Sequence, residues 1–233
     1  MDQKAQALAF LRKDVAQNVH LLEGLLHRNP EILAVSEHGV LLRYLGRLSL
    51  ASDSVDAARE LLQAIPEKPE RIVVCRRDVE EYVARTYGLQ PSTVCIQTSY
   101  LKQMPPPMPE GVDIRPLGLA YHDVVLERYS LFHDPDYITR RLEAGVMYGA
   151  FVSGRLAGFI GEHDEGSMGM LEVFPQYRRM GLGYALEVFQ IRRILAENRI
   201  PYDHVVVTND KSFHLQEKLG MSFSRDYVTF FGI

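Results

Sequence analysis

The stretch "YRRMGLGYALE", from Tyr177 to Glu187, places two arginines and two glycines directly before a helical pattern. Leu182, Leu186 and Phe189 recur at helical spacing, so a helix is expected to begin at or just inside the glycines. The first N–H groups of a helix form a positive end that binds phosphate oxygens, and glycine lets a ligand approach the backbone. The stretch therefore indicates a pyrophosphate site, with a helix start packed tightly on a strand as the alternative explanation of the glycines.

Arg178 and Arg179 strengthen the phosphate interpretation, because a guanidinium can meet phosphate with two parallel hydrogen bonds. Two common nucleotide-binding motifs do not match. A P-loop ends in Gly-Lys-Ser or Gly-Lys-Thr, and the dinucleotide fingerprint has a third glycine inside a parallel strand-helix-strand unit. Meander-like strands precede this loop instead, which favours a different phosphate-bearing ligand.

Composition limits the classes of partner. The chain has 233 residues, of which 46% are hydrophobic, enough for one large core or two modest ones. A formal net charge of -4 gives no general basic field, which argues against nucleic acid or an anionic membrane as partner. Cys75 and Cys95 lie in apolar runs without metal-ligand spacing, so buried thiols in a reducing compartment and no metal are expected. No signal peptide or membrane span is evident, and we expect a cytoplasmic protein.

A proline-rich segment divides the chain. Four prolines in "KQMPPPMPEG" remove backbone donors and impose extended geometry, which is typical of a linker. We therefore predict an N-terminal α/β domain at residues 1–102, a linker at 103–111 and a C-terminal domain at 112–233. In the first domain the patterns predict helices and strands, in chain order a helix over 8–26, one or two strands over 39–52, a helix over 53–65, a strand over 71–75, a helix over 77–88 and a strand over 92–101.

The second domain is expected to contain an antiparallel meander followed by the quoted helix. One broken helix or two should lie between Ala120 and Ala144, with the break near Asp134. The strands and the last helix are predicted as a strand over 112–117, meander strands over 146–152, 155–164 and 167–174, a strand over 204–209, a helix over 210–220 and a strand over 223–233.

Two segments of the chain also resemble each other. "VVCRRDVEEYVARTYGL" from Val73 and "VVVTNDKSFHLQEKLGM" from Val205 align without gaps as strand, helix and closing glycine. Chance similarity and a duplicated domain both explain this match. The first copy lacks anything like "RRMGLG", since the matching region reads "GRLSLASD". Only the second copy holds the predicted phosphate loop.

Two motifs resemble those of a known family. "MLEV", then "FPQYRRMGLG", then a helix, is similar to the acetyl-CoA-binding segment of the GCN5-related N-acetyltransferases, whose pattern is Arg/Gln-x-x-Gly-x-Gly/Ala. Arg178, Gly181 and Gly183 fill that pattern. "NDKSFHLQEKLGMSF" resembles the second segment of the family at Asn209, Ser212, Leu215, Lys218 and Gly220. The resemblance covers roughly residues 112–233.

The resemblance implies the fold class. It is an α/β (α+β) fold with a central mixed, mostly antiparallel sheet flanked by helices. A shortened, cofactor-free half in front of a working one resembles the glycine N-acyltransferase-like (FR47-like) branch. The resemblance thus implies that residues 1–102 form a smaller, degenerate copy of the same fold.

The resemblance also implies the donor, acetyl-CoA, and its contacts. The pantetheine arm is expected to pair with strand backbone around Glu172, and the pyrophosphate to lie on amides from Arg179 to Tyr184. No metal is implied. The implied cofactor-binding residues are Leu171, Val173, Arg178, Arg179, Met180, Gly181, Leu182, Gly183, Tyr184, Asn209, Ser212 and Lys218.

The chain departs from the family at the catalytic positions. Gln216 stands where many members have a tyrosine acid, and Ser167 stands where some have a glutamate base. The catalytic candidates are therefore Glu172, Glu162 and Ser212, with His163, Asp164 and Glu165 nearby in sequence. Burying the Glu172 carboxylate in an apolar strand would be costly, which favours a catalytic role for it. The alternative is an outward-facing carboxylate paired with an arginine. For Glu162 and His163 the alternative is a solvated hairpin end.

These observations predict an N-acyltransferase. The implied reaction moves an acetyl or acyl group from acetyl-CoA to the amine of a small molecule or amino acid by direct attack in a ternary complex. The enzyme is expected to be a monomer or homodimer. The alternative is a catalytically silent acyl-CoA-binding sensor or interaction module, which the missing tyrosine favours. A peptide or protein acetylase is a third possibility and would need an open acceptor groove.

Overall fold

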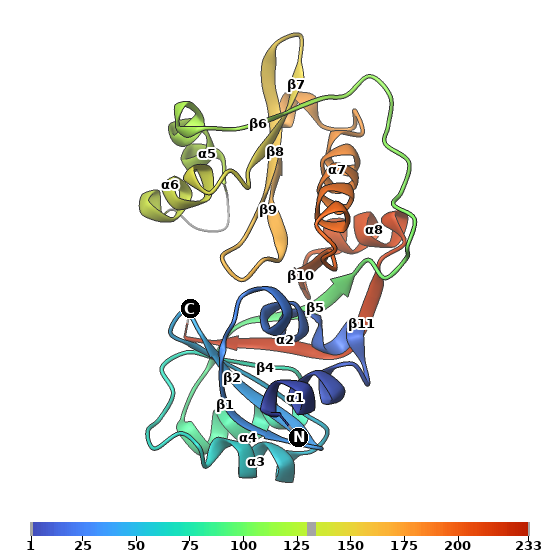
Figure 1. The fold of residues 1–233 in the computed structure, drawn as a ribbon. Coiled ribbons are helices and arrows are strands. Elements are labelled where there is room, and N and C mark those ends of the chain that lie inside the picture. The colour runs from blue at the N-terminus through green and yellow to red at the C-terminus, as the bar shows by residue number, and fades with distance from the viewer. Residues whose placement is uncertain (1, 130–133, 233) are drawn as a thin grey trace. The chain divides into compact units, whose positions relative to one another are not determined.

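The computed structural model describes residues 2–129 and 134–232 and divides into two compact units (Figure 1). The first unit comprises Met1–Ser99, His204–Gln216 and Met221–Ile233, and the second comprises Tyr100–Asp203 and Glu217–Gly220. Neither unit is one consecutive segment, because the end of the chain joins the first unit. As domain boundaries, 1–102, 103–111 and 112–233 stay a prediction.

The first unit is built on a seven-stranded sheet with the order β1-β2-β3-β4-β11-β5-β10. The strands are β1 (Glu31–Ser36), β2 (Gly39–Tyr44), β3 (Arg47–Ser52), β4 (Ile72–Val74), β5 (Pro91–Ser99), β10 (Tyr202–Val206) and β11 (Ser222–Phe231). The β3–β4 pair is parallel, while β1–β2, β2–β3, β4–β11 and β5–β11 are antiparallel. The sheet is thus mixed and mostly antiparallel, as the sequence predicted.

Strand β11 lies in the interior of this sheet. Its residue Thr229 is opposite Val74 of β4 on one side and Val94 of β5 on the other. Strand β5 in turn lies between β11 and β10. β11, from the second half of the sequence, therefore pairs with two strands of the first half, and β5, from the first half, lies between two strands of the second.

Side-chain caps mark the starts of two helices of the first unit. They are α1 (Gln3–Leu11), α2 (Val15–His27), α3 (Val55–Leu62) and α4 (Arg77–Tyr87). Asp14 caps α2 and Ser54 caps α3, each through a side-chain oxygen that accepts a backbone N–H. The single helix predicted over 8–26 is thus two helices. Helices α3 and α4 pack on a core that includes Leu41, Leu50 and Val74.

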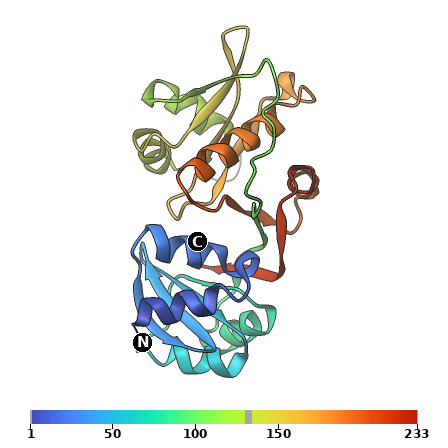
Figure 2. The ribbon, with the colours of Figure 1, turned by 45° about the vertical axis from the view of Figure 1, so that its right-hand side comes forward.

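The second unit contains a four-stranded antiparallel sheet with the order β6-β7-β8-β9. The strands are β6 (Asp113–Pro116), β7 (Tyr148–Val152), β8 (Arg155–Glu162) and β9 (Met168–Val173). Helix α7 (Leu182–Ala196) covers one face, while α5 (His122–Arg128) and α6 (Pro135–Glu143) cover the other (Figures 1 and 2). The predicted meander and the start of α7 are therefore present.

Two core clusters identify the faces of this sheet. Phe159 and Phe174 pack with residues of α5 and α6, and we call this side the α5–α6 face. Ile160 and Val173 pack with Leu186 of α7, and we call this side the α7 face. Because side chains alternate along a strand, these assignments also place the neighbouring polar residues of β8 and β9.

The predicted helix break near Asp134 is present, whereas strand β1 was not predicted. Asp134 caps α6 and Pro135 is its first residue, as the predicted break near Asp134 requires. The remainder of that break, residues 130–133, lies outside the described residues. Strand β1 was not predicted, because the proline at position 30 suggested only a break. Within the described part of the chain, no helix is both long and apolar enough to span a bilayer.

The two similar segments have the same succession of elements. β4-α4-β5 corresponds to β10-α8-β11, in which α8 spans Asp210–Leu219. Both helices are followed by a glycine in the left-handed region, Gly88 with φ 59° and Gly220 with φ 73°. Chance similarity and duplication both still explain this match, and a degenerate first copy stays a prediction.

Candidate functional site

The loop before α7 has the backbone conformation of an open helix start. Arg179 and Gly181 both have left-handed φ angles, 63° and 79°, and α7 begins at Leu182. The N-cap residue of α7 is Gly181, which has no side chain to cap the helix, and the first turn of α7 holds no acidic residue. The first amides of a helix lack intrahelical partners and carry partial positive charge. The loop can therefore present several N–H groups to an anion.

The two glycines are not explained by tight packing. A Cβ built on Gly181 would meet no heavy atom within 4 Å, and one on Gly183 would lie an ordinary 3.7 Å from Val173 Cγ2. The alternative of a helix start pressed onto a strand is therefore wrong. Gly181 is required by its positive φ, and the space over both glycines is open to a ligand.

Basic side chains from two helices' ends gather at this loop. Arg178 and Arg179 are exposed, and Arg178 Nε donates a 3.2 Å hydrogen bond to the Val173 carbonyl oxygen. Lys218, in the last turn of α8, places its Nζ 4.8 Å from the ring centroid of Tyr184 in the first turn of α7. Met180 is 54% exposed beside them. The structure thus brings Lys218 to the predicted phosphate loop.

Strand β9 exposes backbone groups beside the loop. In the sheet formed by residues 113–173, as far as the structure describes it, β9 pairs only with β8. The Phe174 N–H donates to the Ala157 carbonyl at 2.9 Å, so Phe174 faces β8. By alternation the backbone groups of Val173 face away from β8, toward the edge where a ligand can pair.

A β-bulge lies at the centre of β9. Phe159 pairs with Glu172 and Gly161 pairs with Gly169, so two residues, Met170 and Leu171, oppose one on β8. Met170 has a φ of 52°. A bulge bends its strand and re-aims the following side chains, and bulges are frequent beside active sites.

Glu172 is half-buried on the α5–α6 face, opposite Phe159. Its charge is felt by Tyr129, which is 1% exposed. Burial, followed by the negative charges of Asp203, Glu172 and Glu165, raises the pKa of the Tyr129 phenol well above its usual range. Glu172 is thus one of a group of acidic side chains near the α5–α6 face.

Glu162 has a different environment from the predicted one. It lies on the α7 face with Ile160, and it is only 2% exposed. Its carboxylate forms an ion pair with Arg193 of α7, and Arg199 Nη2 donates to its Oε2 at 2.7 Å. The alternative of a solvated hairpin end is therefore wrong. Glu162 and Glu172 lie on opposite faces of the sheet.

The structure adds a polar pair that sequence reasoning did not assemble. Tyr137 Oη and His163 Nδ1 lie 2.6 Å apart, and the His163 ring covers Gly169 so closely that a Cβ there would overlap it. Burial, then the charges of Glu165 and Asp164, raises the pKa of Tyr137. His163 was a candidate by sequence. Tyr137 gave no signal, because 26 residues separate the two.

Asn209 and Ser212 stand at the start of α8, in the first unit. The Asn209 side-chain oxygen accepts the Ser212 N–H at 3.2 Å, so this amide caps the helix. Gln216, at the position of the family's tyrosine acid, is fully buried with Thr98 Oγ1 3.5 Å away. Ser167, at the other departure, is 1% exposed and donates to Glu165 at 2.6 Å.

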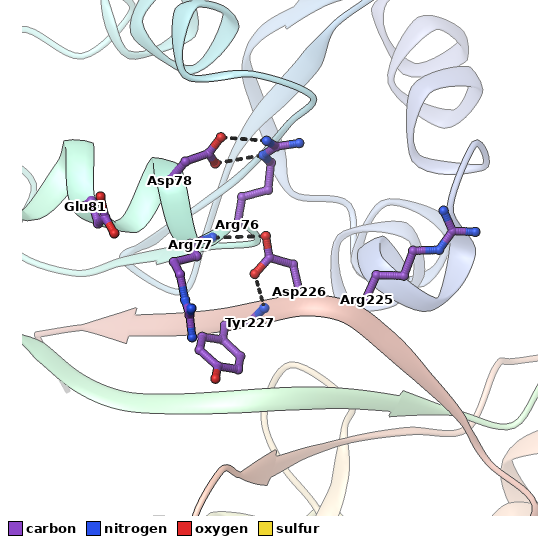
Figure 3. Close-up of a pocket in the computed structure, with 7 residues that line it drawn as sticks. All are labelled: Arg76, Arg77, Asp78, Glu81, Arg225, Asp226 and Tyr227. Carbon is purple, nitrogen blue, oxygen red and sulfur yellow. Dashed lines mark hydrogen bonds and ion pairs between the residues drawn. The ribbon is translucent and has the colours of Figure 1, made fainter.

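A pocket of about 460 Å³ opens elsewhere, in the first unit at the start of α4 (Figure 3). Three arginines and three acidic residues balance each other in its lining, which comprises Arg76, Arg77, Asp78, Glu81, Arg225, Asp226 and Tyr227. Arg76 binds Asp78 through two hydrogen bonds, and Asp226 accepts the Arg77 N–H. No predicted site residue lies there, and its balanced charges select no ligand.

Metal ligation has no support in residues 2–129 and 134–232, where no group of three or more His, Cys, Asp or Glu side chains is placed to hold an ion. Cys75 and Cys95 are buried free thiols. Burial, followed by the charge of Asp226, raises the pKa of the Cys75 thiol. Cys75 is therefore expected to be unreactive.

Comparison with known proteins supplies independent information. Residues 145–229 match the family described as FR47-like protein, a range that runs from β7 through the loop, α7, β10 and α8 into β11. No curated protein shows a significant match to the chain.

Several solved structures share the fold. A Drosophila protein is 22% identical with a TM-score of 0.60, covering 83% of this chain and 72% of its own. A GCN5-related N-acetyltransferase from Kribbella flavida is 12% identical with a TM-score of 0.58, covering 93% and 95%. An acetyltransferase of the GNAT family from Colwellia psychrerythraea is 11% identical with a TM-score of 0.55, covering 94% and 97%. At these identities the likeness shows the fold.

Proposed function

We propose that the chain is an acetyl-CoA-dependent N-acyltransferase, because residues 145–229 match the family described as FR47-like protein and the chain has the fold of the GCN5-related N-acetyltransferases. The acceptor in this proposal is the amine of a small molecule or an amino acid. The observation that carries the proposal is the open loop at Gly181 beside the unpaired edge of β9. Family resemblance alone would leave the donor site unlocated.

The donor contacts follow from the geometry of the second unit. In the proposal the amides from Arg179 to Tyr184 bind the pyrophosphate, Arg178 adds charge there, and Lys218 is a further cation for the donor. The backbone of Leu171 and Val173 is proposed to pair with the pantetheine arm as an added strand would, as the family pattern implies. Asn209 and Ser212 stay predicted donor contacts on the family pattern alone.

The transfer step needs a base and a position for the amine. The amine nitrogen attacks the thioester carbonyl carbon, a C–N bond forms, and the C–S bond breaks with its electron pair leaving on sulfur. Glu172 accepts the proton that the amine loses, and the thiolate takes one from solvent. We propose Glu172 for this role because it follows the bulge of β9, whereas Glu162 is held by Arg193 and Arg199.

The alternative function is a silent acyl-CoA sensor. One observation favours it: Gln216, at the position of the family's acid, is fully buried and cannot donate a proton to a leaving thiolate. Direct transfer does not require that acid, because the leaving thiolate can take its proton from solvent. The two functions therefore differ in turnover and not in donor binding.

A thiol-release assay with acetyl-CoA and a library of amines and amino acids tests the proposal. If the protein is an enzyme, thiol should be released with at least one amine. Glu172→Gln should then lower kcat by about a hundredfold or more, while KM for acetyl-CoA changes little. Glu110→Gln, in the exposed linker, is the matched control and should keep the parent rate. Binding without thiol release for any amine would support the sensor, and an unchanged rate in Glu172→Gln would move the base elsewhere.

The proposal extends to the setting of the protein. A cytoplasmic location agrees with the two buried free thiols, which a reducing compartment preserves. A monomer or homodimer remains the proposed state of assembly.

A further inference from the structure

Lys102, directly before the predicted linker, lies beside the last turn of α8. A Cβ on Gly220 would collide with Lys102 Nζ, so the glycine leaves the space that the ammonium occupies. Gly220 follows Lys218 by two residues, and Lys218 is the cation over Tyr184. The two lysines therefore approach the same end of α8 from different parts of the sequence.

Lys102 is positioned by a rigid neighbour. Its Nζ lies 5.7 Å from the ring centroid of Tyr100, which is only 4% exposed. The Tyr100 N–H donates to the Pro201 carbonyl at 2.8 Å, and its hydroxyl donates to the Met104 carbonyl at 2.7 Å. The ring is thus fixed at both ends, and the ammonium above it loses less freedom when it binds a ligand.

The lysine pair carries charge that no acidic side chain neutralises. Among the described residues, neither Lys102 nor Lys218 has a carboxylate within ion-pair distance, and each ammonium instead lies over an aromatic ring. Arg193 and Arg199 show the contrast, because both are paired with Glu162 and Glu197. Uncompensated cations held near a phosphate loop favour a second anionic group on the same ligand.

We propose that Lys102 and Lys218 bind the ribose 3′-phosphate of coenzyme A, so that the segment before the linker determines donor specificity. This inference rests on the proposed function. The amides and arginines of the loop are proposed to bind the pyrophosphate. Lys218 lies over the ring of Tyr184, which is the last residue of that row of amides. The 3′-phosphate is separated from the pyrophosphate by one ribose, so it needs a second cationic group near the loop, which the lysine pair supplies.

Calorimetric titration of the full chain with coenzyme A and with 3′-dephospho-coenzyme A tests the inference. The parent protein should bind coenzyme A at least about tenfold more tightly, as expected for a charge-assisted contact. Lys102→Ala should weaken coenzyme A binding by about tenfold and leave dephospho-coenzyme A within about twofold. Lys68→Ala, an exposed lysine of the first unit, should change neither value. Lys102 is itself exposed, so its replacement should not impair folding.

The possible outcomes separate the two proposals. Equal affinity of the parent for both ligands would overturn the 3′-phosphate site and leave the acyl-CoA proposal intact. Equal weakening of both ligands by Lys102→Ala would also overturn it, since the lysine would then act on the pyrophosphate or on the fold. Failure of the parent to bind either ligand would overturn the proposed function together with this site. The supporting result is that Lys102→Ala no longer binds coenzyme A more tightly than 3′-dephospho-coenzyme A, whereas Lys68→Ala still does.

Discussion

At the scale of single residues, Glu162 should matter for stability more than for chemistry. Its buried carboxylate neutralises Arg193 and Arg199, so Glu162→Gln leaves two largely buried guanidinium groups with less opposing charge. We expect the free energy of unfolding to fall by about 3 kcal/mol, measured by urea denaturation. Glu197→Gln removes a 43% exposed partner of the same arginines and should cost less than about 1 kcal/mol. Equal, small losses in both variants would contradict this account.

The sequence predicted single residues well where backbone chemistry is local. Gly181 and the arginines before it were identified because a positive φ and a helix start depend only on neighbours in the chain. Glu162 was misjudged because its face and its partners depend on strand alternation and on a helix 31 residues away. The Tyr137–His163 pair was missed for the same reason. Contacts across elements are set by tertiary packing, which a residue pattern does not report.

At the scale of elements, α5 and α6 bring two phenols to the α5–α6 face whose pKa values are raised chiefly by burial. A raised pKa in the folded state means that folding retains a proton that the unfolded chain releases. Stability from Tyr129 and Tyr137 is thus complete below their ordinary pKa of about 10 and declines as pH rises above it. Measured by urea denaturation from pH 8 to 11, the decline above pH 10 should be shallower in Tyr137→Phe. An unchanged slope would contradict the buried phenol.

The elements themselves were largely predictable. The meander, α7 and the helix closing on Gly88 follow from alternation, from helical spacing and from glycine's access to left-handed φ. The helix break at Asp134 was found because a residue that precedes proline is disfavoured in a helix. The break between α1 and α2 was not found, because apolar spacing continues across Asp14. The bulge of β9 was also missed, since it is a property of the pair β8–β9 and not of either strand alone.

At the scale of the whole molecule, the first unit should not fold without the end of the chain. Strand β11 occupies the position between β4 and β5, so its removal splits the sheet and leaves each of these strands without a hydrogen-bonded neighbour on one side. A chain ending at Gly220 should therefore lose the cooperative unfolding transition of the first unit. Residues 1–102 alone should lack one as well. Circular dichroism during urea denaturation provides the measurement, and a cooperative transition in the 1–102 fragment would contradict the expectation.

The sequence did not reveal which strands β11 pairs with. Two similar strand-helix-strand segments were recognised, and each forms the predicted elements. Apolar strands carry no local mark of which partner they pair with, so consecutive domains were the simplest expectation. The sheet order instead places β11 among strands from the first half of the sequence.

Titration of acetyl-CoA into the parent protein and into Gly181→Leu, followed by calorimetry, is the most direct test of the acyl-CoA assignment. Gly145→Leu is the matched control, because Gly145 also has a positive φ, 67°, and open space around it. The account predicts one-site binding tighter than about 1 mM by the parent and by Gly145→Leu. Binding should be abolished in Gly181→Leu, whose side chain fills the phosphate space. Undiminished binding by Gly181→Leu, or no binding by the parent, would contradict it.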